Sequence, residues 1–229
     1  MSLIKLKNVS KIYRLGSQRI PALADLSLSF DAGEFAVLAG PSGSGKTTAL
    51  NLIGCLDRPT AGQVIVSDLE LGTASPRELA DFRLQHIGFI FQSYNLIPVL
   101  TAAENAEFTL MLQKVPKRLR RQRVCQLFLE LGINGLEERR PADLSGGQQQ
   151  RVAIARAMAA DPHVILADEP TANLDSHTAE GLLELMRRLN REQGTTFIFS
   201  SHDDRVISQA RRVIRLEDGH LADDITITT

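Results

Sequence analysis

The chain has 229 residues, of which 43% are hydrophobic and 23% are charged, and its formal net charge is −1. A chain of this length and composition can bury a sizeable core without disulfide bonds, either as one large domain or as a core domain with an inserted subdomain. The charge balance excludes a general attraction to nucleic acid or anionic lipid, although it leaves room for a local patch. Cys55 and Cys125 match no metal or redox spacing, which indicates two small buried or half-buried thiols in a reducing compartment.

The chain begins with two segments that alternate apolar and polar side chains, the pattern of half-buried strands. They are residues 3–13 and 22–30, and a turn-forming run, Asp-Ala-Gly-Glu, follows at 31–34. This order predicts an antiparallel layer at the start of the chain and no signal peptide. No apolar run approaches the roughly 18 residues that a membrane-spanning helix needs, so a membrane role is expected to pass through a partner.

Further along, continuous apolar runs predict strands that are buried on both faces. The runs are residues 35–39, 164–170 and 195–202. Helical patterns separate them, which favours a mostly parallel α/β sheet. Residues 73–143 are rich in Leu, Glu, Arg and Gln and predict a helical insert in this core. Near the end, residues 211–222 predict a hairpin that turns at Asp218-Gly219.

The first of these apolar runs leads directly into a glycine-rich loop with one lysine, followed by a helical segment. The match to the pattern G-x-x-x-x-G-K-[ST] and its flank consists of Gly40, Pro41, Ser42, Gly43, Ser44, Gly45, Lys46, Thr47 and Thr48. Glycines let successive backbone N–H groups point inward, and the positive end of the helix also attracts phosphate. Lys46 is therefore expected on the β- and γ-phosphates of a nucleotide, and Thr47 on Mg²⁺. The alternative is a flexible turn with an exposed lysine.

Two acidic residues stand at the end of the next apolar run, where a nucleotide cradle needs a group that holds a metal. A buried strand over residues 164–167 would place Asp168 beside the loop, where it can hold Mg²⁺ through water. Because successive side chains diverge, Glu169 can face the γ-phosphate and polarise water as a general base. A solvated strand end with two acids is the simpler alternative.

A second glycine motif, Leu-Ser-Gly-Gly-Gln at residues 144–148, begins another helix. Ser145 and Gln148 have the spacing of a capping box, which by itself indicates only a helix N-terminus. Gly146 and Gly147, however, remove side chains from the first turn. They leave its N–H donors and the Ser145 hydroxyl open to an anion.

With this motif placed shortly before Asp168 and Glu169, the chain resembles ATP-binding cassette (ABC) proteins over essentially its whole length. Four further family motifs occur, matched by Tyr13 for stacking on adenine, Gln92 for the Q-loop, Asn173-Leu174-Asp175 for the D-loop and His202 for the switch. Considered without the other motifs, these residues have simpler structural interpretations. Tyr13 can cap the first strand, and Asp175 can be a helix N-cap.

The resemblance implies an α/β fold, the P-loop ATPase cassette. Its RecA-like core would occupy about residues 1–72 and 161–229, with a mostly parallel sheet and an N-terminal antiparallel β layer. A helical subdomain would be inserted at about residues 73–160 and would include the signature helix at 144–159. The resemblance also implies ATP and Mg²⁺ as the bound cofactors.

In this family two cassettes pair head to tail, with ATP between them. The resemblance implies that Ser145, Gly146, Gly147 and Gln148 of a second copy close on the γ-phosphate, and that Asp175 contacts the partner. It implies catalytic roles for Glu169, His202 and Gln92, and metal binding by Thr47, Gln92 and Asp168. Gln92 would link the nucleotide state to a docking surface at residues 94–96.

Three uses of the ATP energy stay open. The chain can serve a membrane transporter, signal mechanically across a membrane, or act as a soluble ABC ATPase on DNA or ribosomes. The distance from Thr47 to Leu144 is too short for the coiled-coil arm of the DNA-repair type, and a single cassette argues against the tandem translation-factor type. The basic run at residues 114–123 lacks interleaved aromatic residues, which favours a solvated helical face over nucleic-acid binding.

Several stretches resemble the branch that holds the lipoprotein-releasing, macrolide-export and cell-division cassettes. They are residues 11–16, 54–62, 89–105 and 168–175. The resemblance implies a cytoplasmic ATPase that is peripheral on the inner face of the cell membrane. It would be held there by an integral membrane permease with a large extracytoplasmic domain. Residues 200–206 depart from the Thr-His-Asp expected in this branch but keep His202, and residues 54–62 do no phosphate chemistry.

Overall fold

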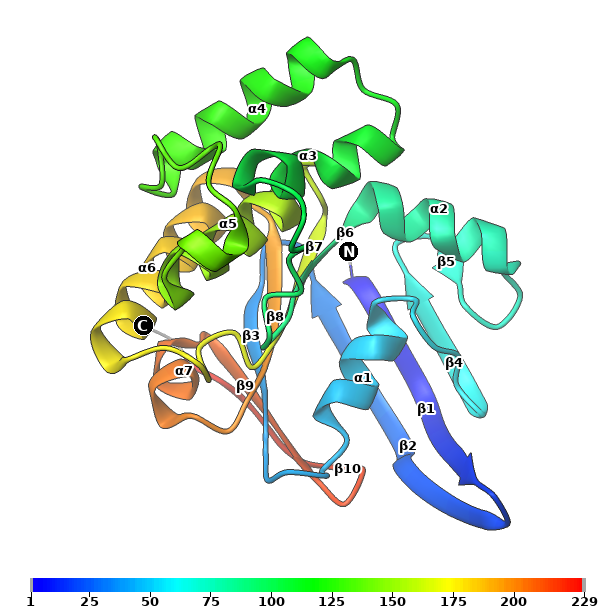
Figure 1. Ribbon diagram of the computed structural model, residues 1–229. Helices are drawn as coiled ribbons and strands as arrows, with labels where there is room; N and C mark the ends of the chain where they lie inside the picture. Colours follow the sequence, from blue (N-terminus) through cyan, green and yellow to red (C-terminus); the bar gives the residue numbers. More distant parts are fainter. Residues whose placement is uncertain (1, 228–229) are drawn as a thin grey trace.

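The computed structural model describes residues 2–227, which form two β-sheets with helices between and around them (Figure 1). The smaller sheet is antiparallel and has the strand order β2–β1–β4–β5. Its strands are β1 (Ser2–Leu15), β2 (Gln18–Asp31), β4 (Ala61–Val66) and β5 (Leu69–Glu70). The antiparallel layer predicted at the start of the chain is therefore present, and two later strands extend it.

The larger sheet has the order β10–β9–β3–β8–β7–β6, and its neighbouring strands are parallel except for β9 and β10. Its strands are β3 (Phe35–Ala39), β6 (Ile87–Ile90), β7 (Val164–Asp168), β8 (Thr196–Ser201), β9 (Arg212–Glu217) and β10 (His220–Thr226). The mostly parallel sheet predicted from the apolar runs is confirmed. The predicted terminal hairpin is formed by β9 and β10, and Asp218 and Gly219 turn there with φ angles of 47° and 80°.

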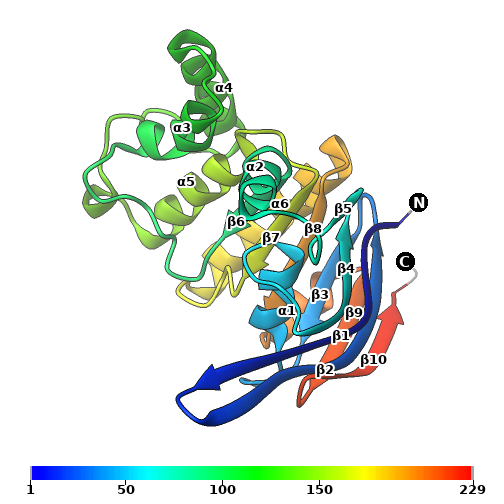
Figure 2. The ribbon, with the colours of Figure 1, turned by 90° about the vertical axis from the view of Figure 1, so that its right-hand side faces the viewer.

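The helices fall into groups with different neighbours. They are α1 (Lys46–Ile53), α2 (Pro76–His86), α3 (Ala102–Leu112), α4 (Lys117–Glu130), α5 (Gly146–Met158), α6 (Ser176–Gln193) and α7 (Asp204–Gln209), with a 3₁₀ turn at Pro141–Asp143. α3, α4 and α5 pack against one another at one end of the molecule (Figures 1 and 2). α1 contacts strands of both sheets and lies between them.

Three of these helices begin in the same way, with a Ser or Thr followed three residues later by Glu or Gln. The pairs are Ser75 with Glu78, Thr101 with Glu104, and Ser145 with Gln148. In each pair the side chain of one residue binds the backbone N–H of the other. These capping boxes satisfy N–H groups that have no partner inside the helix, so they fix where α2, α3 and α5 start.

Alternate side chains of the larger sheet enter two separate hydrophobic cores. Val37 and Phe199 pack in a core with α3, α4, α5 and α6. Leu38 and Ile198 pack in the other core, with α1 and the smaller sheet. Because both faces of β3 and β8 are covered, every residue of these two strands is buried. This explains why β3 and residues 197–199 of β8 are continuous apolar runs.

The segment predicted as mostly helical, residues 73–143, also contains the strand β6. It pairs in parallel with β7 at the edge of the larger sheet. A strand of four residues between a helix and a loop is too short to change the composition of a helical segment, so the sequence does not reveal it.

The two cysteines lie in different surroundings. Cys55 is buried after the end of α1, as predicted, and burial raises the pKa of its thiol to about 11. Cys125 is exposed on α4, so the prediction of a buried or half-buried thiol is wrong there. The apolar stripe of α4 passes beside this position rather than through it, with Val124 and Phe128 in the core.

Candidate functional site

The glycine-rich loop runs from the end of β3 to the first turn of α1. Gly40 and Gly45 have φ angles of 145° and 99°, and a Cβ there would lie 2.2 Å and 2.5 Å from a carbonyl oxygen of a neighbouring segment. The Lys46 ammonium donates to the carbonyl oxygens of Gly40 and Pro41, each at 2.8 Å, so its side chain lies folded over the loop. Among residues 2–227 no side chain caps α1, which leaves the N–H groups of its first turn available to an anion.

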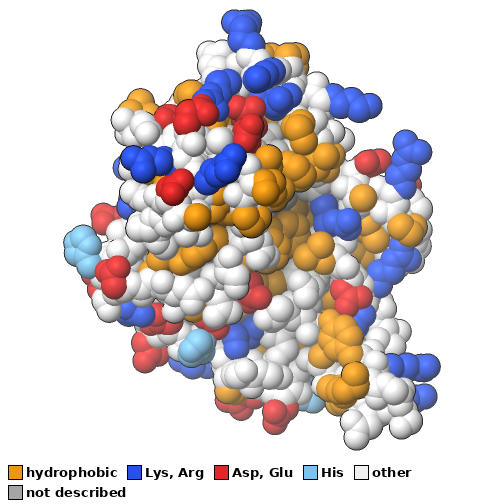
Figure 3. All heavy atoms as spheres, in the orientation of Figure 1, with side chains coloured by type: hydrophobic (Ala, Val, Ile, Leu, Met, Phe, Trp, Pro, Cys, Tyr) orange, Lys and Arg blue, Asp and Glu red, His pale blue; other side chains and the backbone are white. Residues whose placement is uncertain are grey.

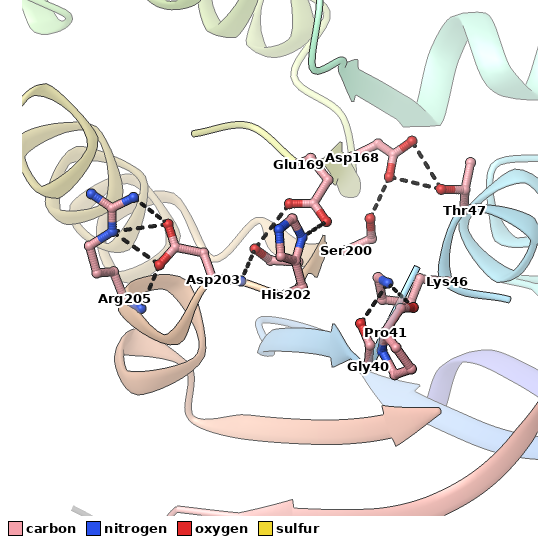
Figure 4. A network of polar contacts seen from close by, with 11 residues as sticks. Gly40, Pro41, Lys46, Thr47, Asp168, Glu169, Ser200, His202, Asp203 and Arg205 are labelled. Carbon is pink, nitrogen blue, oxygen red and sulfur yellow. Dashed lines mark hydrogen bonds and ion pairs between the residues drawn. The ribbon is translucent and has the colours of Figure 1, made fainter. Parts of the chain in front are cut away.

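Asp168, the last residue of β7, faces Thr47 on α1 (Figure 4). The Thr47 hydroxyl donates toward the carboxylate and lies 3.2 Å from Oδ1 and 3.3 Å from Oδ2. The Ser200 hydroxyl of the neighbouring strand β8 also donates to Oδ1. Ser200 was not among the residues predicted from the sequence. Ser200 lies opposite Asp168 in the pairing of β7 with β8. The sequence of either strand alone does not predict this pairing.

Glu169 follows β7 with a φ of 46°, a rare conformation for a residue other than glycine and one that often marks a functional site. Its Oε1 lies 2.7 Å from Nδ1 of His202 (Figure 4). Its Oε2 accepts a hydrogen bond of 3.3 Å from the Ser201 hydroxyl. Asp203 caps α7 and binds Arg205, which fixes the chain just after His202. The Glu169 side chain is 16% exposed, so the carboxylate is shielded but still reachable by water.

A cavity of about 500 Å³ brings most of the predicted site residues together. Those that line it are Tyr13, Ser42, Gly43, Gly45, Lys46, Thr47, Thr48, Gln92, Asp168, Glu169 and His202. Ile20, Pro21 and Ala22 of β2 add an apolar side that the sequence analysis did not predict. The cavity is therefore apolar beside Tyr13 and polar beside the loop and the acidic residues.

Ser145, Gly146, Gly147 and Gln148 lie outside this cavity, at the N-terminus of α5. The Gln148 N–H donates to Ser145 Oγ at 3.3 Å, and the Ser145 N–H donates to Gln148 Oε1 at 2.9 Å. A Cβ on Gly147 would lie 2.6 Å from the side chain of Thr178, so this glycine also lets α5 approach α6 closely. The motif is thus well formed but does not line the cavity of its own chain.

Asp175 also lies outside the cavity, where it caps α6. It accepts hydrogen bonds from the Thr178 hydroxyl at 2.7 Å and from the Thr178 N–H at 3.0 Å. These hydrogen bonds hold the pKa of the Asp175 carboxyl below its usual value. The helix N-cap that the sequence allowed is therefore present.

The loop after β6 carries Gln92 and is tied to α5 by an arginine. Arg156 donates to the carbonyl oxygen of Asn95 at 2.5 Å and to that of Tyr94 at 2.8 Å, and burial lowers the pKa of its guanidinium. The Gln92 carbonyl accepts a hydrogen bond of 2.9 Å from Asn173. These contacts, which the sequence analysis did not predict, join the loop both to α5 and to the segment before α6.

Comparisons with known proteins give consistent matches. Residues 23–172 match a family model described as "ABC transporter". The chain is 46% identical to the ABC transporter ATP-binding protein MJ0796 of Methanocaldococcus jannaschii, over 96% of this chain and 95% of that protein. It is 44% identical to the macrolide export ATP-binding/permease protein MacB of Salmonella typhimurium, over 96% of this chain and 34% of that longer protein.

Solved structures match over nearly the full length. A dimeric structure of the MJ0796 cassette in a post-hydrolysis state, bound to ADP and phosphate, matches with a TM-score of 0.91 and 43% identity, over 99% of each chain. The cbiO1 protein of Clostridium perfringens, part of the transporter complex cbiONQ, matches with a TM-score of 0.88 and 25% identity, over 99% of this chain and 89% of that one. The fold class predicted from the sequence is confirmed.

Proposed function

This chain belongs to the ABC transporter family as an ATP-hydrolysing subunit, and from this premise we propose that the cavity beside the glycine-rich loop is where ATP binds and reacts. The family and the activity predicted from the sequence are thereby confirmed. One observation carries the placement of the site. A single cavity joins the Tyr13 ring, the loop, the Thr47–Asp168 pair and the Glu169–His202 pair.

The loop side of the cavity suits the phosphates of ATP. Lys46 would exchange its two carbonyl acceptors for oxygens of the β- and γ-phosphates, beside the uncapped end of α1. The oxygens of Thr47, Asp168 and the Gln92 side chain are hard donors of the kind that Mg²⁺ prefers. Within residues 2–227 no cluster of three or more His, Cys, Asp or Glu side chains could hold a metal alone, so nucleotide oxygens and water would complete the shell. Bound Mg²⁺ neutralises charge on the β- and γ-phosphates.

Hydrolysis needs a group that takes a proton from water, and Glu169 is placed for that role. Its carboxylate is held by Ser201 and His202 at the edge of the cavity. Glu169 accepts the proton while the water oxygen bonds to the γ-phosphorus. At the same time, the bond between that phosphorus and the oxygen bridging it to the β-phosphate breaks, which yields ADP and phosphate. His202 donates to the γ-phosphate oxygens as negative charge shifts within the transition state.

A second copy of the chain would complete the site. Ser145 and Gly147 lie outside the cavity of their own chain, and Ser145 is exposed. In a head-to-tail dimer, the Ser145 hydroxyl and the first N–H groups of α5 from the second copy can bind the γ-phosphate. The related MJ0796 cassette forms a dimer in a structure bound to ADP and phosphate, which supports the pairing of two copies.

Replacing Ser145 with arginine is expected to preserve ADP binding by the monomer and to abolish both ATP-dependent dimer formation and turnover. The reason is that a large charged side chain at the start of α5 blocks the face that meets the partner's nucleotide but leaves the chain's own cavity intact. Loss of the cap costs about 1 kcal/mol of helix stability, so thermal unfolding is measured alongside. Size-exclusion chromatography with ATP, ADP titration and phosphate release are the readouts.

Ser208→Arg, on the exposed side of α7, is the matched control and is expected to dimerise and hydrolyse like the parent chain. If Ser145→Arg lost ADP affinity while staying folded, the residue would have to serve its own cavity. The head-to-tail scheme would then be wrong.

A second cavity, of about 540 Å³, lies between α2, β6, α3 and α5. Apolar side chains such as Leu84 and Leu112 line much of it, and Figure 3 shows hydrophobic side chains gathered around this hollow. Arg156 and part of the predicted docking loop, Tyr94–Leu96, border it. We propose that a segment of a membrane permease docks here, because Arg156 connects the cavity to the loop that carries Gln92.

The proposed partner is an integral membrane permease with a large extracytoplasmic domain, and the chain would sit as a peripheral subunit on the inner face of the membrane. Related proteins named for both an ATP-binding and a permease part support the permease, and the branch resemblance supports its extracytoplasmic domain. Among residues 2–227, no helix is both long and apolar enough to span a bilayer. The soluble alternative is not favoured, since the relatives are named as transporter proteins.

The basic run on α4 has partners of its own, which weakens a nucleic-acid reading further. Arg120 and Arg121 both form ion pairs with Glu107, and Arg121 also pairs with Glu138. The sequence predicted a solvated helical face, and part of this face is instead neutralised by acidic residues of the same chain. We expect no role for nucleic acid.

A further inference from the structure

The segment between α1 and β4 forms hydrogen bonds with β1, the strand that carries Tyr13. The Asp57 carboxylate accepts a hydrogen bond of 3.0 Å from the Tyr13 hydroxyl and one of 2.5 Å from the Lys11 ammonium. It also accepts one of 2.7 Å from the Arg58 N–H, and Lys11 donates further to the Arg58 carbonyl at 2.8 Å. One carboxylate thus holds two side chains of β1.

The backbone makes a second connection between the same two segments. The Thr60 hydroxyl accepts a hydrogen bond of 3.0 Å from the Ile12 N–H, and the Thr60 N–H donates to the Ser10 carbonyl at 2.8 Å. These bonds attach to β1 on both sides of Lys11. The strand is therefore fixed against the segment after α1 next to the residues that Asp57 holds.

Lys11 and Tyr13 are two residues apart on β1, so their side chains share one face of the strand. The Lys11 ammonium lies over the Tyr13 ring, 4.9 Å from its centroid. A cation on one face leaves only the opposite face of the ring for stacking, and Tyr13 lines the nucleotide cavity. The ring is thus presented to a ligand in one orientation.

We propose that Asp57 and Lys11 are positioning residues that hold the Tyr13 ring ready to stack on the adenine of ATP, an inference that rests on the ATP site proposed above. Lys11, Tyr13 and Asp57 are called the base clasp from here on. A ring that is ordered before binding loses less conformational freedom when the base arrives, so affinity rises.

The base clasp also links the two ends of the nucleotide. Asp57 follows α1, whose first turn meets the phosphates, whereas Tyr13 stands on the smaller sheet and meets the base. A hydrogen bond between Asp57 and Tyr13 therefore fixes the distance from the phosphate loop to the stacking ring. The segment at residues 54–62, for which the sequence suggested only a family resemblance, acquires a physical role.

The test compares the affinity of the full chain for ADP with its affinity for pyrophosphate, which has the phosphates but no base. The comparison separates effects on base binding from effects on phosphate binding. Asp57→Ala and Tyr13→Phe each remove the hydrogen bond between these residues, and each is expected to weaken ADP binding roughly three- to tenfold. Tyr13→Ala, which lacks the ring, is expected to weaken it about tenfold or more. Pyrophosphate affinity is expected to match the parent chain in all three variants, because their loop is intact. Calorimetry and competition measurements give the two affinities.

Steady-state kinetics distinguish positioning from general destabilisation. The loss in Asp57→Ala is expected in KM for ATP rather than in kcat, since the base lies away from the reacting bond. Asp57→Asn keeps an oxygen that accepts from the Tyr13 hydroxyl and is expected to recover part of the loss. Asp68→Ala removes an exposed carboxylate of the same sheet, in the turn between β4 and β5, and is the matched control.

The outcomes are distinguishable. If the parent chain bound ADP no more tightly than pyrophosphate, or Tyr13→Ala bound ADP normally, the stacking role in the proposed ATP site would be wrong and the base clasp with it. If Tyr13→Ala weakened ADP binding but Asp57→Ala and Tyr13→Phe did not, the ATP site would stand and the base clasp alone would be overturned. The double variant offers a further check. Asp57→Ala is expected to add no loss to Tyr13→Ala, and additive losses contradict an action through the ring.

Discussion

Replacing Glu169 with glutamine is expected to stop ATP turnover while ATP still binds and holds two copies of the chain together. Glutamine has the shape of glutamate and can still bind Ser201 and His202, so the cavity should keep its geometry. It cannot take a proton from water, and general-base catalysis contributes about 10²- to 10⁴-fold to a rate. ATP that is bound but not split would keep the dimer closed. Phosphate release should therefore fall by that factor while a dimer persists on a sizing column.

The matched control is Glu184→Gln, on the exposed side of α6, which is expected to hydrolyse ATP like the parent chain. Two results would count against the proposal. Phosphate release at the parent rate would mean that another group takes the proton. A Glu169→Gln chain that stays monomeric with ATP and Mg²⁺ would contradict ATP-driven pairing.

Replacing Lys46 with alanine is expected to weaken binding of both ADP and pyrophosphate by at least about tenfold. The ammonium has two carbonyl acceptors in the loop and can exchange them for phosphate oxygens. A hydrogen bond from a charged donor contributes about 1.5–3 kcal/mol, and 1.4 kcal/mol corresponds to a tenfold change in affinity. Calorimetric titration measures the loss, which should affect both ligands alike because both carry the phosphates that Lys46 meets.

Lys5→Ala removes an exposed lysine from β1 and serves as the control for charge. Because Lys46→Ala also deprives Gly40 and Pro41 of a donor, its thermal unfolding should be compared with that of the parent chain. A folded Lys46→Ala chain with unchanged ADP affinity would contradict the assignment of the loop as a phosphate-binding loop. The same variant separates this prediction from the base clasp, whose variants lose affinity for ADP only.

The strand, glycine-rich loop and helix proposed to bind the phosphates could be predicted from the sequence because they are built from consecutive residues. A buried strand, a glycine-rich loop and a helix follow one another between residues 35 and 53, and local chemistry determines how they meet. The family resemblance added Tyr13, Gln92 and His202, which the structure places on the same cavity. The parts that these residues take in binding and hydrolysis stay predictions.

Contacts between segments far apart in the sequence could not be predicted in this way. Ser200 meets Asp168 only through the pairing of β7 with β8, and a shift of one residue would turn its side chain to the other face. Asp57, in the segment after α1, meets Tyr13 of β1 across 44 residues. Arg156 reaches the loop after β6 in the same manner. In each case the sequence contains both partners but no local pattern that pairs them.

The backbone conformation at Glu169 lowers folding stability at the residue that is proposed to be needed for turnover. A φ of 46° costs a residue with a side chain roughly 1–2 kcal/mol, whereas glycine adopts it freely. Glycine at this position is therefore expected to give a more stable protein that lacks the proposed general base. A laboratory selection for heat resistance alone would therefore favour variants that bind nucleotide but do not hydrolyse it. Only selection on the reaction itself preserves the strained residue.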